Sequence, residues 1–482
     1  MKIRSIAIFV VILIFTLTSF GQNSYPIVET GVHSFYSNTA IISTQSVGAA
    51  FYGQDATYQG NEPSYTSNGN GTITDNVTGL IWQKDMGTKI TFSKAFIKAD
   101  TMTLGGYSDW RVPTIKELYS LIKFTGQSGG TTSIKKYIDT VYFNQPIGDT
   151  TIGERVIDAQ TWSSTQYKGL TMNGDSTVFG VNFIDGRIKG YPKYLPGSGN
   201  TNPNSMYFRM VRGNTNYGIN HFVNNNDGTI SDTATGLMWQ QADDGIARDW
   251  ENALSYAENL TLANYTDWRL PNAKELNSIV DYSRSPSYTN SAAIDPLFIV
   301  TSISDPNGVM GQYPYFWTST SHLDGANPYS AGVYFAFGKA QGKMNGTLLD
   351  VHGAGAQRSD PKTGTAADYP QYFGPQGDVR YVFNYTRCVR TISGSNRINE
   401  QNELNLFDVF PNPTSDNCTI SFNKSYSNVK IVLYNTLGTK VKETVISNLK
   451  STQISINDLP KGVYLIQISA DNSVFTNRII KL

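Results

Sequence analysis

One sixteen-residue phrase occurs twice in this chain, and it constrains the fold more than any other feature. "YSDWRVPTIKELYSLI" runs from Tyr107 to Ile122, and "YTDWRLPNAKELNSIV" runs from Tyr265 to Val280. In each copy a proline ends the preceding segment, and a capping residue is followed three positions later by glutamate, which predicts a new helix. A chain usually builds an active site once. The repetition therefore favours a folding signature or a duplicated binding module.

The duplication extends far beyond this phrase. "NGTITDNVTGLIWQ" (70–83) matches "DGTISDTATGLMWQ" (227–240), and "TWSST" (161–165) matches "FWTST" (316–320). The Asn-Gly and Asp-Gly pairs predict tight hairpin turns. Matching tryptophans lie 157, 158 and 155 residues apart: Trp82 and Trp239, Trp110 and Trp268, Trp162 and Trp317. A period this long predicts two tandem domains rather than a solenoid of short repeats.

The charged and aromatic residues of the repeated phrase could be interpreted as a site. We instead expect Trp110 and Trp268 to be core residues, because apolar positions surround them. Glu117 and its counterpart Glu275 are expected to cap a helix. Asp109 and its counterpart in the second copy are expected to pair with the adjacent arginine. The phrase is therefore interpreted as scaffold.

The N-terminus predicts a secretory signal over residues 1–21. Lys2 and Arg4 precede an apolar run from Ile6 to Phe20, and a small-x-small cleavage pattern ends before Gln22. The run is shorter than the ~20 residues that a membrane-spanning helix needs. No other stretch is apolar enough to span a bilayer, so we expect a soluble mature protein without a transmembrane segment.

Charge and motif content exclude several classes of function. The chain has 38 basic and 38 acidic residues, which gives no sign of a nucleic-acid partner. Its only cysteines, Cys388 and Cys418, fall in different predicted domains and exclude a disulfide framework. No zinc-protease motif, nucleophile elbow, phosphate-binding loop or EF-hand occurs. We therefore predict no catalytic residues, no metal and no cofactor.

The C-terminal segment contains "FPNPTSDNCTISF", "LPKGVYLIQI" and the closing "NRIIKL". It resembles the C-terminal sorting domain of type IX secretion cargo. The resemblance implies that the type IX machinery is a partner and that the sorting domain is removed. It also implies an extracellular or outer cell-surface location on a Gram-negative bacterium.

The two long units resemble the Lcl C-terminal domain family. "GTITDNVTGLIWQ" with "YSDWRVPTIKEL" carries the match in the first unit, and "GTISDTATGLMWQ" with "YTDWRLPNAKEL" carries it in the second. A further likeness, in the Trp-Arg-Leu-Pro phrase, is to the C-type lectin-like fold. These resemblances imply an α+β class with two tandem C-type lectin-like domains, followed by an all-β immunoglobulin-like sandwich. The expected segments are a signal peptide (1–21), a first domain with its lead-in (22–214), a second domain (215–395), a linker (396–405) and a sorting domain (406–482).

The second unit carries the main asymmetry. From Trp317 to Val389 is 72 residues, against 49 from Trp162 to Val211. The extra segment, Leu348–Tyr381, is expected to be a long loop, and such loops are often functional. Six of its residues are the candidate binding residues: His352, Arg358, Asp360, Tyr372, Asp378 and Arg380. The alternative is a self-packed loop whose arginines and aspartates satisfy one another.

The sequence therefore predicts a secreted or cell-surface, non-enzymatic binding or adhesion protein. Carbohydrate is the preferred ligand, by analogy with the fold and with the Tyr- and Asn-rich loops. One alternative is an extracellular enzyme acting on polysaccharide, with its site in the long loop of the second unit. The other is a structural surface component that binds protein.

Overall fold

The computed structural model describes residues 25–129 and 134–392, and residues 407–481 except 411, 413, 427, 436, 437, 448, 471 and 472. The chain divides into two compact units, residues 1–395 and 396–482. The predicted signal peptide (1–21) and linker (396–405) lie outside the described residues. The predicted boundary at residues 214 and 215 falls inside the first unit, and the domain boundaries stay predictions.

Each half of the first unit contains a four-stranded antiparallel sheet built from the same stretches of the repeat. In both sheets the hairpin glycine, Gly71 or Gly228, has a positive φ, as the Asn-Gly and Asp-Gly pairs predicted. The first sheet contains β3 (Tyr65–Ser67), β4 (Thr72–Asp75), β5 (Ile81–Gln83) and β11 (Val211–Arg212). The second contains β12 (Phe222–Asn224), β13 (Thr229–Asp232), β14 (Leu237–Gln240) and β24 (Val389–Thr391).

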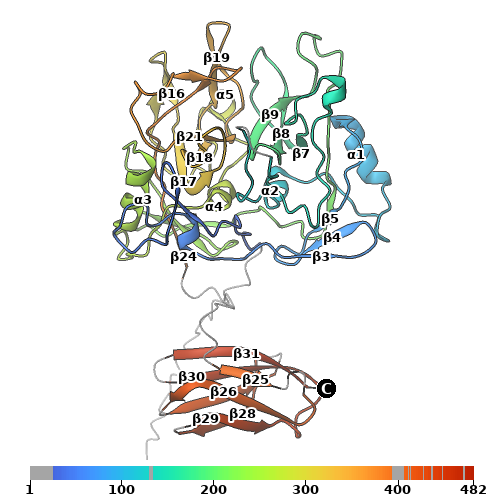
Figure 1. Ribbon diagram of the computed structural model, residues 1–482, viewed down its shortest axis with the longest axis vertical. Helices are drawn as coiled ribbons and strands as arrows, with labels where there is room; N and C mark the ends of the chain where they lie inside the picture. Colours follow the sequence, from blue (N-terminus) through green and yellow to red (C-terminus); the bar gives the residue numbers. More distant parts are fainter. Residues whose placement is uncertain are drawn as a thin grey trace, which may run out of the picture. The chain divides into compact units, whose positions relative to one another are not determined.

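A central sheet joins the two halves. Its six strands run in the order β17-β18-β21-β9-β8-β7, so each half contributes three consecutive strands (Figure 1). The halves meet where Gln357 on β21 pairs with Ile188 on β9. The strands are β7 (Thr161–Gln166), β8 (Thr177–Asn182), β9 (Arg187–Pro192), β17 (Tyr315–His322), β18 (Ala331–Ala336) and β21 (Gln357–Pro361).

The helices are short, and the expected α+β class with C-type lectin-like domains was wrong. Strands dominate the described residues, in many small antiparallel sheets, and the chain belongs to the all-β class. The helical stripes of the sequence do form helices, but each ends within three turns, and turn-rich segments between them fold as hairpins. The helices are α1 (Phe92–Thr101), α2 (Ile115–Tyr119), α3 (Trp250–Glu258), α4 (Ala273–Ser278), α5 (Pro286–Thr289), and the 3-10 turns η1 (Asp55–Thr57) and η2 (Thr150–Ile152).

The extra segment of the second half is not a structureless loop. Together with β19, which lies just before it, this segment forms one four-stranded sheet, in the order β20-β19-β23-β22. These strands are β19 (Gln341–Met344), β20 (Thr347–Asp350), β22 (Tyr372–Phe373) and β23 (Asp378–Val379). The described part of this unit also contains three two-stranded sheets: β1 (Phe35–Tyr36) with β2 (Ile41–Ile42), β6 (Ile90–Thr91) with β10 (Ser205–Met206), and β15 (Ile303–Ser304) with β16 (Met310–Gln312).

The two halves share one hydrophobic core. Tyr119 of the first half packs edge-on against Phe335 of the second, with ring centroids 5.9 Å apart. Phe179 of the first half likewise packs against Tyr282 of the second, at 4.9 Å. All four residues belong to a single buried cluster that spans both repeats. Each repeat thus buries apolar surface that it could not cover alone.

The second unit contains two antiparallel sheets that enclose a separate aliphatic cluster. Seven strands are described there, the number that the alternating pattern predicted. One sheet contains β25 (Phe407–Phe410), β26 (Asn417–Tyr426) and β29 (Leu449–Ser455). The other contains β27 (Val429–Tyr434), β28 (Lys440–Ile446), β30 (Gly462–Ala470) and β31 (Ser473–Lys481).

Candidate functional site

The repeated phrase forms the same helix start in both halves. Thr114 accepts a hydrogen bond from the Glu117 amide (3.2 Å), and the Glu117 carboxylate accepts one from the Thr114 amide (2.8 Å). Asn272 and Glu275 form the same capping box. Each glutamate also forms an ion pair with the arginine of the phrase, Arg111 or Arg269. Trp110 and Trp268 are buried, as predicted.

The aspartate of the phrase has a distant partner. Asp109 accepts hydrogen bonds from Arg212 at 2.6 and 3.1 Å, and the Arg212 guanidinium lies 3.7 Å from the ring centroid of Tyr107. The second half repeats this arrangement with Asp267, Arg390 and Tyr265. The expectation that the aspartate pairs with the adjacent arginine was therefore wrong. Glutamate holds that arginine, and the closing strand supplies the aspartate's partner.

A second arginine of each closing segment is buried among backbone carbonyls. Arg209 donates to the carbonyls of Gln83, Lys84 and Asn144 at 2.7–2.8 Å. Arg387 donates to the corresponding three carbonyls in the second half. Burial lowers the pKa of Arg209 to about 9 and that of Arg387 to about 10. Through these hydrogen bonds each arginine connects the closing segment of its repeat to earlier segments of the same repeat. Both arginines therefore belong to the scaffold.

Three of the six predicted loop residues come together. His352 lies 2.8 Å from Asp378 through its Nε2 atom, and the Arg358 guanidinium contacts both residues. The positive charge of Arg358 holds the pKa of Asp378 well below its usual range, and burial lowers the pKa of His352 to about 4. The cluster is internally paired, as the self-packed alternative describes.

The other three predicted residues lie apart from this cluster. Asp360 is buried and accepts hydrogen bonds from the Tyr381 amide (3.2 Å) and the Asn384 side chain (3.1 Å). Burial raises its pKa to about 7. Tyr372 lies beneath the Lys343 ammonium, and the Arg380 guanidinium stacks on an aromatic ring of the same sheet. The six residues do not converge on one pocket.

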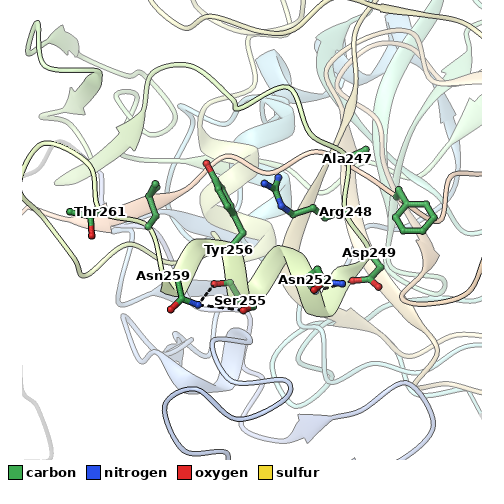
Figure 2. A pocket seen from close by; sticks show the side chains of 10 residues that line it. Ala247, Arg248, Asp249, Asn252, Ser255, Tyr256, Asn259 and Thr261 are labelled. Atoms are coloured by element: carbon green, nitrogen blue, oxygen red, sulfur yellow. Dashed lines mark hydrogen bonds between the residues drawn. The ribbon is translucent and has the colours of Figure 1, made fainter.

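An open groove runs along α3 in the second half (Figure 2). Its volume is about 550 Å³, and Asn252, Ser255 and Asn259 line up along the outer face of the helix. The Arg248 guanidinium lies 4.0 Å from the centroid of the Tyr256 ring. Phe383, which is 45% exposed, also lines the groove. The groove therefore combines polar side chains with an exposed aromatic wall.

A second cleft, of about 760 Å³, opens on the repeated phrase of the first half. Arg111, Glu117 and Thr165 line it, together with Asp100 from the end of α1. Residues of the second half, such as Asp281, complete the wall. Sequence reasoning missed this cleft. No motif marks the cleft, and its signal in the sequence is the unequal length of the segments that lead into the two repeats.

Comparison with known families agrees with a chain that contains two related repeats followed by a separate C-terminal unit. The family model of the Lcl C-terminal domain matches residues 71–212 and 228–351, which together are more than half of the chain. The chain belongs to the Lcl C-terminal domain family. The second match ends at residue 351, before all six predicted loop residues, so those residues lie outside the matched segment. A secretion system C-terminal sorting domain matches residues 408–482, which indicates export by type IX secretion to the cell surface or extracellular space.

Other comparisons add little. No curated protein matches this member of the family. One solved structure, described as the extracellular domain of a hybrid two component system from B. thetaiotaomicron, is 9% identical with a TM-score of 0.12. The match covers 87% of this chain and 55% of that one, so the chain spans about half the length of that structure. Among the described residues, no helix has both the length and the apolar character needed to cross a membrane.

Proposed function

We propose that this Lcl-family protein is a non-enzymatic binding protein of the cell surface or extracellular space, and that the α3 groove binds carbohydrate. The observation that carries the proposal is the composition of the groove. The Asn252 side chain has no hydrogen-bond partner among the described residues, and the Thr261 hydroxyl lies in the same lining. An amide or a hydroxyl can both donate to and accept from a sugar hydroxyl.

The apolar part of the groove suits the other face of a sugar. Leu260 and the exposed Phe383 offer the surface on which the C–H groups of a pyranose ring pack. In the first half, the position equivalent to Asn252 is Lys94. The two residues are 158 positions apart, the same spacing as that of the matched tryptophans Trp110 and Trp268. The groove is therefore a property of the second repeat, and a change confined to that repeat should remove binding.

The enzymatic alternative placed its site in the extra segment of the second half. The two carboxylates that it would use, Asp360 and Asp378, already accept hydrogen bonds from neighbouring protein groups. Neither lines the groove or the cleft described above. Their hydrogen bonds favour a structural role, and the binding proposal has more support.

A glycan array on the full chain tests the proposal, with Asn252→Ala and Phe383→Ala as test variants. Lys94→Ala, on the matched helix of the first half, is the control. We expect retention of a defined set of glycans and a loss of about 10-fold in affinity for each test variant, the effect of about 1.4 kcal/mol. An array that retains no glycan, or retention that the test variants leave unchanged, would contradict the proposal.

A further inference from the structure

The lead-in to the first repeat contains a long excursion, here called the lead-in loop (residues 30–60). Its two ends are joined, because Val28 pairs with Asn61 and the Glu29 amide donates to the Asn61 carbonyl at 2.8 Å. The loop lies on the second repeat, and the contacts of Asp55 and Tyr58 are among its hydrogen bonds to that repeat. It thus covers a repeat that follows it by about 200 residues in the sequence.

The second lead-in has no such excursion. Lys274 donates to the carbonyl of Glu29, and Lys116 donates to that of Gly218, so these two positions are equivalent. From Glu29 to the hairpin residue Asn70 is 41 residues, whereas from Gly218 to Asp227 is 9. The first repeat therefore lacks a covering segment of its own.

Asp55 and Tyr58 show what the covered site of the second repeat holds. Asp55 accepts a hydrogen bond of 2.5 Å from the Thr320 hydroxyl. Tyr58 donates to Glu258 at 2.6 Å, and its ring centroid lies 5.3 Å from the Arg269 guanidinium. The single turn η1 places the carboxylate and the phenol three residues apart.

Each of these three anchors has a counterpart in the first repeat. Thr320 corresponds to Thr165, Arg269 to Arg111, and Glu258 to Asp100. The match of the threonines is also geometric. Each hydroxyl accepts a hydrogen bond of 3.0 Å from the first amide of the capped helix in its own repeat, Ile115 of α2 or Ala273 of α4. All three counterparts line the open 760 Å³ cleft. The side chain of Arg111 is 29% exposed, against 10% for Arg269.

We propose that this cleft binds a peptide turn of the form Asp-x-x-Tyr from another protein, in the way that the second repeat holds the lead-in loop of the same chain. The aspartate would accept from Thr165, the tyrosine hydroxyl would donate to Asp100, and its ring would lie on Arg111. Two further carboxylates, Asp281 and Asp295, line the cleft and disfavour segments with several acidic residues.

A second copy of this chain is a poorer source of the peptide. Its own Asp55 is buried beneath Thr320, and Tyr58 is bonded to Glu258 within the same molecule. Both ends of the loop are fixed by the pairing of Val28 with Asn61. Releasing the loop would break these contacts, so the occupant is expected to be a different protein.

A cyclic peptide that contains Gln-Asp-Ala-Thr-Tyr-Gln, the sequence of residues 54–59, is the probe, and calorimetry on the full chain is the measurement. We expect one site, with affinity reduced at least about 10-fold by Thr165→Val or by Asp100→Ala. Asp100 is exposed, so its substitution should not affect folding. Asn252→Ala, in the α3 groove, is the control and should leave peptide binding unchanged.

Three results would overturn the proposal. The first is no binding of the probe, and the second is equal binding of probes with Asp→Ala or Tyr→Phe. The third is self-association of the chain, measured by analytical ultracentrifugation, that Thr165→Val abolishes, because a second copy would then fill the cleft. Glycan binding in the α3 groove is independent of all three results.

Discussion

The two repeats share a scaffold but differ in what covers it. In the second repeat the Arg269–Glu275 pair lies beneath the lead-in loop, whereas in the first repeat the equivalent Arg111–Glu117 pair faces an open cleft. The second repeat also carries the additional β19–β23 sheet. The difference teaches that the repeated phrase builds the compartment, and that segments outside the phrase decide whether the compartment is available to a ligand.

The largest expected effect tests whether the scaffold is the same in both repeats. Arg209→Met and Arg387→Met each remove a buried guanidinium and its hydrogen bonds to three backbone carbonyls. We expect each change to lower the free energy of unfolding of the first unit by about 4 kcal/mol. Urea denaturation followed by tryptophan fluorescence measures this loss. A large effect in one repeat and a negligible effect in the other would show that the two arginines are not equivalent.

A smaller effect should distinguish the covered repeat from the open one. Arg269→Met leaves Glu275 close to Glu29 and Asp55, whose pKa values burial and neighbouring carboxylates raise to about 8 and about 6. We expect a cost of about 3 kcal/mol, because the substitution removes the positive charge of a buried ion pair and leaves several carboxyl groups close together. Arg111→Met, at the partly exposed pair, should cost about 1 kcal/mol. Equal costs in the same denaturation assay would contradict the difference in burial.

One pH effect should come from an acidic residue that the first repeat lacks. Asp360, whose counterpart on the matched strand is Tyr191, has a folded-state pKa raised to about 7 from an ordinary value of 3.8. The folded state therefore holds its proton more tightly, and the contribution to stability is lost as pH rises from about 4 to about 7. The slope is about 1.4 kcal/mol per pH unit. Asp360→Asn should reduce the measured slope by this amount, and an unchanged slope would be inconsistent with a buried, protonated Asp360.

Much of the local structure follows from the sequence. Short-range chemistry determines the features that were predicted correctly. These are the capping boxes at Thr114 and Asn272, the hairpins at Gly71 and Gly228, and the burial of the tryptophans. The sorting domain and the predicted location outside the cell were inferred from several ordered motifs, and the family match confirmed both.

Long-range features could not be predicted in this way. The partner of Asp109 is Arg212, 103 residues away, because Glu117 competes successfully for the adjacent arginine. The helix after Pro113 stops at Tyr119, although the apolar spacing continues to Ile122, and such early stops produced the wrong fold class. The cleft is open because no segment of the described chain covers the first repeat. The absence of a segment cannot be recognised from a motif in the sequence.

Thiol labelling at the two equivalent threonines tests the central claim most directly. Thr165→Cys would place a thiol in the open cleft, whereas Thr320→Cys would place one under Asp55, at a fully buried position. Both natural cysteines are buried and give little background. In the native chain, Thr165→Cys should react readily with a maleimide, and Thr320→Cys should react only after unfolding. Equal labelling rates would contradict the claim that one compartment is open and its twin is occupied.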